Sequence, residues 1–132
     1  MATLSAAASS AGQAQPTGST IRLQGKCEYG ERITPYADGS NGFAWCDSIV
    51  IVQDGQHATF DFLRESWGSM VRYEADPSSD PMVVMRVQVR NRPAEPAQGT
   101  CTIYRLEGRI STVTCIATAR QLAWAANFVP RR

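Results

Sequence analysis

Two cysteines, Cys101 and Cys115, lie on either side of a short turn sequence at residues 107–109. If those three residues form the loop of a hairpin, Leu106 faces Ile110 and Cys101 faces Cys115. Directly opposed residues in an antiparallel pair have Cβ atoms about 4.5–5.5 Å apart. A disulfide requires roughly 3.5–4.5 Å between the same atoms. The spacing therefore predicts a two-stranded ribbon closed by a cross-strand disulfide.

The chain has four cysteines, Cys27, Cys46, Cys101 and Cys115, which allow two disulfides in three pairings. We predict Cys27–Cys46 and Cys101–Cys115, because this pairing closes the shortest loops. A zinc site is the weaker alternative, because no two cysteines have the short spacing of structural zinc ligands. Free buried thiols in a cytosolic protein are the other alternative. Disulfides form in oxidising compartments, so the prediction indicates a periplasmic or secreted protein.

Composition limits the remaining classes. The 132 residues are enough for one domain, and a hydrophobic fraction of 43% is enough for a core. No apolar run approaches the ~20 residues of a membrane helix, so no membrane span is expected. A net charge of +1 argues against a nucleic-acid partner held by phosphate contacts.

The first twenty residues differ from the rest of the chain. They are rich in Ala, Ser, Gly and Gln, and no charged residue precedes Arg22. Residues 1–20 are therefore interpreted as a disordered tail or as the remnant of a secretory signal peptide. A single β-rich domain is expected over residues 21–130.

Apolar and polar residues alternate with period two through most of that domain, which is typical of half-buried strands. At 54–55, Asp-Gly favours a two-residue turn that places Ile51 opposite Ala58 and Ile49 opposite Phe60. Gly25 falls on an inward position, which indicates a bulge or a close approach of backbones. Strands are expected over about 21–29, 43–52, 58–62, 67–73 and 83–90, followed by the two strands of the cysteine hairpin.

The last segment fits two patterns. Thr118 and Gln121 match a capping box, and the alanines that follow favour a helix. Residues 122–128 also alternate with period two, as a strand would. We predict a short helix over residues 119–128. The fold class is thus all-β, a single antiparallel meander of about seven strands forming a small barrel or sandwich, with a short C-terminal helix. Unpaired edge strands would allow two copies of the chain to pair as a homodimer.

One set of candidate site residues lies on the apolar face of the Asp-Gly hairpin. Trp45, Phe60 and Phe62 could line a cavity for an apolar ligand, or they could form an ordinary core. Asp47 falls between them on the same face, where a carboxylate could anchor a ligand or act as the acid of a small enzyme. The alternatives are a β-bulge that turns Asp47 outward and a salt bridge between Asp47 and an arginine in the core.

A second set, Arg86, Arg90 and Arg92, occupies alternate positions along and just beyond one strand. These arginines could bind an anionic partner, or they could belong to a solvated sheet face. The chain has a single histidine and no recognised nucleophile, phosphate-loop or metal motif, so no catalytic residue, metal ligand or cofactor is predicted. The sequence favours a non-catalytic binding module for a protein partner or, alternatively, a small apolar ligand.

Overall fold

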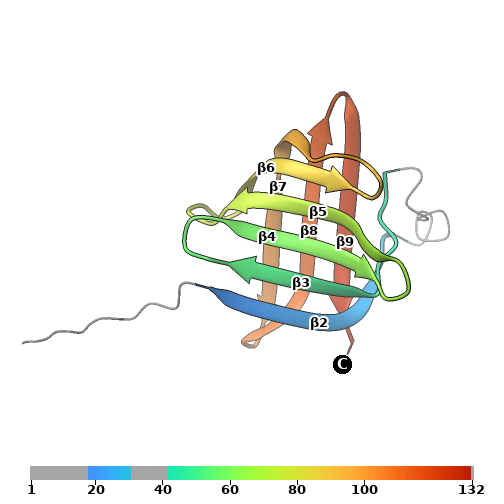
Figure 1. Cartoon of the computed structure of the whole chain (residues 1–132). Helices are drawn as coiled ribbons and strands as arrows, with labels where there is room; N and C mark the ends of the chain where they lie inside the picture. Colours follow the sequence, from blue (N-terminus) through green and yellow to red (C-terminus); the bar gives the residue numbers. More distant parts are fainter. Residues whose placement is uncertain (1–17, 31–41, 132) are drawn as a thin grey trace, which may run out of the picture.

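The computed structural model describes residues 18–30 and 42–131, and they form eight antiparallel strands in a closed barrel (Figure 1). Each strand pairs with the next along the chain, and the last pairs with the first. The predicted antiparallel meander is confirmed, and it closes as a barrel. Most of the predicted tail at 1–20 lies outside the described residues. The strands are β2 (Ser19–Cys27), β3 (Ser48–Gln53), β4 (Ala58–Arg64), β5 (Gly68–Asp76), β6 (Met82–Val89), β7 (Glu95–Leu106), β8 (Arg109–Ala119) and β9 (Leu122–Pro130).

The barrel is flattened into two layers. In Figure 1, β2 to β6 run across the front, and β7 to β9 cross behind them. Register shifts interrupt the pairing of β4 with β5, β5 with β6, and β6 with β7. Such bulges bend strands and allow one sheet to turn the corner between two layers.

Side chains fill the interior. Four aromatic residues, Phe60, Phe62, Tyr73 and Phe128, are fully buried. The rings of Phe62 and Tyr73 meet edge to face, with centroids 5.7 Å apart. Small buried residues belong to the same core: Ala58, Ala75, Ala117, Ala119 and Ala126. An eight-stranded barrel is just wide enough for such filling, so the core is a packed one.

The barrel closes at a glycine. Gly25 lies opposite Pro130 where β2 leaves β3 and joins β9. A Cβ atom at this position would collide with the carbonyl of Val129 and with the Phe128 ring. The predicted close approach is confirmed, and only glycine allows the two strands to come together here.

Both predicted disulfides are present. Cys27 bonds to Cys46 and Cys101 bonds to Cys115, with Cα atoms 5.0 and 4.1 Å apart. All four cysteines are buried, and none is free. The two bonds are therefore part of the core, and they are compatible with an oxidising extracellular compartment.

The turn of the cysteine hairpin is shorter than predicted. Glu107 and Gly108 alone form it, with φ values of 54° and 81°, the left-handed backbone of a two-residue hairpin turn. Leu106 therefore faces Arg109 rather than Ile110. Ser111 is the extra residue of a bulge, and beyond it the predicted facing of Cys101 and Cys115 is restored.

The Asp-Gly turn, by contrast, is longer than predicted. Ile51 faces Phe60 rather than Ala58, because residues 54–57 form a four-residue loop. The Asp54 carboxylate accepts hydrogen bonds from the N–H groups of Gln56 and His57, which lowers the pKa of Asp54. The change moves the pairing by two residues, so each side chain keeps its predicted face.

The predicted C-terminal helix over 119–128 is wrong. Arg120 and Gln121 have φ values of 52° and 69° and form a tight turn, and β9 then pairs with β8 along its length. Alanine favours a helix only weakly, and the pairing with β8 and burial of Phe128 outweigh that preference. No helix long and apolar enough to cross a membrane occurs among the described residues.

Candidate functional site

All three tryptophans of the chain lie at one mouth of the barrel, together with three arginines. They come from the segment before β3, the β4–β5 turn, the β6–β7 connection and the start of β9. In Figure 1, the β4–β5 and β6–β7 connections lie on the right-hand side. We call this group the tryptophan–arginine cluster; its members are Trp45, Arg64, Trp67, Arg90, Arg92 and Trp124.

The β4–β5 turn supplies the centre of the cluster. The N–H of Trp67 donates to the carbonyl of Arg64 at 2.8 Å, which closes the turn. The N–H of Glu65, inside the turn, donates to both carboxylate oxygens of Asp47 at 2.9 and 3.1 Å. The N–H of Asp47 in turn donates to the carbonyl of Leu63 at 2.8 Å. Asp47 therefore fixes this turn to the segment that carries Trp45.

Stacking joins the side chains of the cluster. The guanidinium carbon of Arg64 lies 3.3 Å from the ring centroid of Trp45 and 4.4 Å from that of Trp67. Arg90 lies 5.0 Å from the Trp67 ring. Cation–π contacts at exposed sites each contribute about 0.5–1 kcal/mol. Several of them acting on the same rings restrict how these large side chains can move.

The β6–β7 connection brings the other two arginines. The N–H of Arg90 donates to the carbonyl of Met70 at 2.9 Å, and its side chain donates to the carbonyl of Trp67. Asn91 has a φ of 64°, which turns the chain sharply. Arg92 then lies over the Trp124 ring, with its guanidinium carbon 5.5 Å from the centroid.

A hollow of about 260 Å³ opens between Trp67 and Trp124. Arg90 and Asn91 lie on its border. The other lining residues are small or apolar: Gly42, Ala44, Met70, Val71, Val89 and Ala125. The site therefore combines an apolar floor, two indole rings and a cationic rim.

The arginines of the cluster have no carboxylate partner among the described residues. The ion pairs of that part of the chain join Arg72 to Asp61, Arg86 to Glu74, Arg120 to Glu95 and His57 to Asp54. Trp45 and Trp67 are 44% and 49% exposed, which is high for the largest apolar side chains. Both observations describe an exposed surface that is aromatic and cationic.

The first predicted set of site residues is not brought together. Phe60 and Phe62 are fully buried in the core, whereas Trp45 lies outside in the cluster. Asp47 is partly exposed and holds the N–H of Glu65, so its carboxylate is engaged in the turn. A backbone irregularity between Cys46 and Ile49, both fully buried, turns Asp47 out of the barrel, as the bulge alternative had it.

The three arginines of the second predicted set do not all lie in one place. Arg90 and Arg92 belong to the cluster, whereas Arg86 lies 4.0 Å from Glu74 on the outer face of the sheet. Sequence reasoning missed Arg64, Trp67 and Trp124 as site residues. The sequence contained little signal for them, because Trp67 begins a predicted strand and Trp124 falls within the predicted helix.

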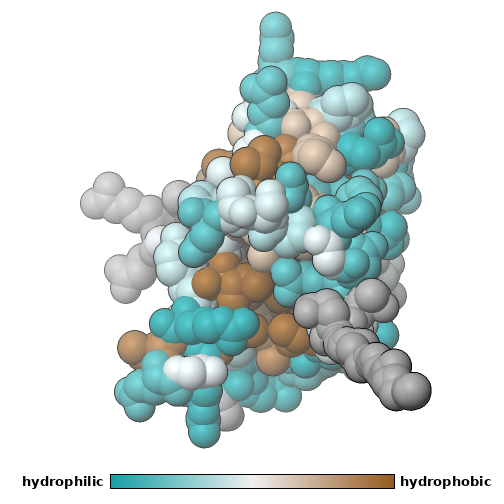
Figure 2. Space-filling view, turned by 90° about the vertical axis from the view of Figure 1, so that its left-hand side faces the viewer, coloured by the Kyte–Doolittle hydropathy of each residue, from teal (hydrophilic) through white to brown (hydrophobic). Residues whose placement is uncertain are grey.

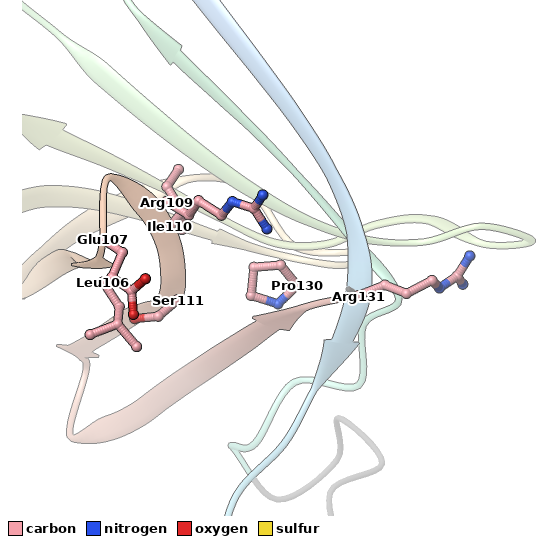
Figure 3. A pocket seen from close by; sticks show the side chains of 7 residues that line it. All are labelled: Leu106, Glu107, Arg109, Ile110, Ser111, Pro130 and Arg131. Atoms are coloured by element: carbon pink, nitrogen blue, oxygen red, sulfur yellow. The ribbon is translucent and has the colours of Figure 1, made fainter.

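The barrel has a further hollow and an apolar surface away from the cluster. A hollow of about 480 Å³ lies beside the β7–β8 turn, where Arg109 points toward Pro130 and Arg131 points away (Figure 3). The face on the left of Figure 1 shows apolar groups surrounded by polar ones (Figure 2). Among the described residues, those that line the hollow beside the β7–β8 turn include no aromatic side chain.

Within the described residues, no group of three or more His, Cys, Asp or Glu side chains could hold a metal ion. The single histidine, His57, is exposed in the β3–β4 loop. No protein-family model, no curated protein and no solved structure matches the chain.

Proposed function

We propose that this chain is a non-catalytic binding module that docks a protein partner on the tryptophan–arginine cluster. The observation that carries the proposal is the convergence of three tryptophans and three arginines from four separate segments on one mouth of the barrel. Tryptophan and arginine are enriched among the residues that contribute most to protein–protein affinity.

The cluster is prepared for binding before a partner arrives. Arg64 is stacked on two rings, and Arg90 is tied to the carbonyl of Trp67. Each mobile side chain that an interface must immobilise costs about 0.5–1.5 kcal/mol. Side chains that are already held reduce that cost, so a modest surface can bind with useful affinity.

The hollow suggests how a partner would dock. Its volume of about 260 Å³ is below the ~300–1,000 Å³ of sites for drug-sized ligands. It has room for one large apolar side chain, which would lie between Trp67 and Trp124. Interfaces concentrate affinity in such anchors, with surrounding contacts that exclude water.

Selection from a random peptide library displayed on phage, against the folded protein, tests the proposal. We expect the selected peptides to bind the wild-type protein and to bind the Trp67→Ala variant with at least tenfold lower affinity. Tyr104→Ala is the matched control, because Tyr104 is 51% exposed on another part of the barrel. Peptides that bind wild type and Trp67→Ala equally, or a selection that yields no binders, would contradict the proposal.

We place the module in the periplasm or outside the cell. Two buried disulfides support this location, because cytosolic proteins rarely keep such bonds. Alkylation and mass spectrometry of protein from its native host should find no free thiol without reductant. Four alkylated cysteines would contradict the location without affecting the docking surface.

A small apolar ligand is the second candidate occupant, favoured by the apolar floor of Met70, Val71 and Val89. Such a ligand would bind at the mouth rather than between Phe60 and Phe62, which lie in the packed core. Native mass spectrometry of protein from its host distinguishes the two candidates, because a co-purified compound would add a discrete mass that Trp67→Ala removes.

A further inference from the structure

The stacked arginines keep most of their hydrogen-bonding capacity. A guanidinium has five N–H donors in one plane, and stacking on a ring uses the faces of that plane rather than its edge. Arg90 donates from one terminal nitrogen to the carbonyl of Trp67. The remaining donors of Arg90 have no acceptor among the described residues, and Arg64 has none for its side chain.

The donors and the apolar hollow are adjacent. Arg90 itself borders the hollow, and its guanidinium lies 5.0 Å from the ring of Trp67, which forms one wall. The other wall is Trp124, with Arg92 over its ring. A group in the hollow therefore has cationic donors at its rim on the side of Trp67 and a further guanidinium beside Trp124.

We infer that the cluster recognises an acidic side chain next to a large apolar or aromatic one, on a protein segment. The inference rests on the proposed docking function and specifies its ligand. The apolar side chain enters the hollow between Trp67 and Trp124, and the neighbouring carboxylate accepts hydrogen bonds from Arg90. Arg64, whose guanidinium carbon lies 4.4 Å from the centroid of the Trp67 ring, adds a second positive charge.

Two physical arguments favour a carboxylate over a neutral acceptor. Arginine–carboxylate hydrogen bonds are charge-assisted and often paired, which makes them about twice as strong as neutral ones. No carboxylate of residues 18–30 and 42–131 lies within ion-pair distance of Arg64, Arg90 or Arg92, so an incoming acid would displace no carboxylate of these residues. The chain as a whole carries a net charge of only +1, so an acid must be selected by local contacts rather than by the overall charge of the molecule.

The test uses the Trp67-dependent peptides from the phage selection, synthesised with their acidic residues intact or replaced by the matching amides. Affinity is measured by titration, and the binding site by the NMR shifts of the three indole N–H groups. We expect an Asp or Glu beside an aromatic or large aliphatic residue in most clones. We expect the amide versions to bind at least tenfold more weakly, and affinity to fall as salt increases.

Variants separate charge from packing. Arg90→Gln should lower the affinity for the acidic peptides at least tenfold and leave the affinity for the amide versions almost unchanged. Arg86→Gln is the matched control, because Arg86 lies in β6 just before Arg90 but outside the cluster, near Glu74. Arg90→Lys tests whether paired donation is needed, and we expect it to recover only part of the affinity.

The outcomes distinguish the two proposals. Trp67-dependent peptides without acidic residues, or amide versions that bind equally well, would overturn the inference and leave the docking function standing. A selection without Trp67-dependent peptides would overturn both. Binding of heparin that depends on Arg90, with no peptide selected, would assign the cluster to a sulfated polysaccharide and would overturn both as well.

Discussion

The hydroxyl of Tyr73 donates a hydrogen bond of 2.9 Å to the backbone carbonyl of Trp124 across the interior of the barrel. Tyr73 is fully buried on β5, and Trp124 lies near the start of β9. The bond therefore connects the two layers directly beneath the tryptophan–arginine cluster. It relates the packing of the core to the position of one wall of the binding hollow.

Replacing Tyr73 with Phe should lower the free energy of unfolding by about 1–3 kcal/mol, because the Trp124 carbonyl loses its donor in a dry environment. Chemical denaturation followed by tryptophan fluorescence measures the change. Tyr104→Phe is the control, and it should change stability by less than about 0.5 kcal/mol because Tyr104 is exposed. Equal stabilities for wild type and Tyr73→Phe would show that the cross-barrel bond contributes nothing.

The barrel should lose stability in alkaline solution. Burial raises the pKa of Tyr29 from 10.0 to about 12, and it raises the pKa of Tyr73 as well. In the unfolded chain both phenols ionise near pH 10, whereas in the folded chain they keep their protons. Both contributions are thus complete below pH 10. The contribution of Tyr29 is lost as the pH rises through about 12, and that of Tyr73 continues to decline at higher pH.

Urea denaturation at a series of pH values from neutral to strongly alkaline measures this loss. Tyr29→Phe should show a shallower decline than the wild type, since one of the two linked groups is absent. Identical pH dependence in the two proteins would argue that Tyr29 is accessible to solvent in the folded state.

Two glycines should be intolerant of alanine. A Cβ at Gly25 would overlap the carbonyl of Val129, and one at Gly99 would overlap the carbonyl of Ile116. Backbone atoms cannot move aside as the end of a side chain can, so each substitution should cost roughly 2 kcal/mol or more. Gly30→Ala is the control, because a Cβ there meets no atom of the described residues within 4 Å. Thermal denaturation of the three variants checks the order.

The faces of the strands were predictable because they depend on local alternation. Ile49, Ile51, Phe60 and Phe62 all lie inside the barrel as expected, although the turn between the two strands is longer than predicted. A change of two residues in pairing preserves every face. The facing of Cys101 and Cys115 survived for a different reason, because a bulge at Ser111 compensates for the shorter turn.

Features that depend on distant partners were not predictable. Val83 and Met85 alternate with Val84 in the sequence, yet Val83 and Met85 are 50% and 43% exposed because a bulge opposite β5 shifts the pattern. The segment after Arg120 was compatible with helix or strand, and only its pairing with β8 decides between them.

In the candidate site, too, local features were predictable and features that depend on distant segments were not. Arg90 and Arg92 were predicted from their alternate spacing, which is a local property. The meeting of Trp45, Trp67 and Trp124 depends on closure of the barrel, which no local pattern in one sequence specifies. Asp47 was identified by its position, but its carboxylate supports a turn rather than lying on the apolar face.

The disulfides should resist reduction in the folded protein. Cys46, Cys101 and Cys115 are fully buried, and Cys27 is 7% exposed. A reductant can reach them only when the barrel opens, so thiol release should follow the rate of unfolding. Samples are reduced with dithiothreitol for increasing times, and the protein thiols are then counted by alkylation and mass spectrometry. We expect four alkylated cysteines to appear quickly in urea and slowly in buffer. Rapid release in buffer would indicate local opening that bypasses global unfolding.

Asp47 should determine the geometry of the cluster without touching a partner. Asp47→Ala removes both acceptors of the Glu65 N–H, and we expect a loss of about 1 kcal/mol in stability. The NMR shifts of the Trp45 and Trp67 indole N–H groups should change, because the turn that carries Arg64 and Trp67 is no longer fixed. Asp47→Asn keeps one oxygen acceptor, so its effects should be smaller.

Asp61→Asn is the control for the Asp47 variants. The carboxylate of Asp61 accepts hydrogen bonds from Ser69 and Arg72 outside the cluster, so its loss should leave both indole shifts unchanged. Unchanged indole shifts in Asp47→Ala would mean that stacking alone holds the turn.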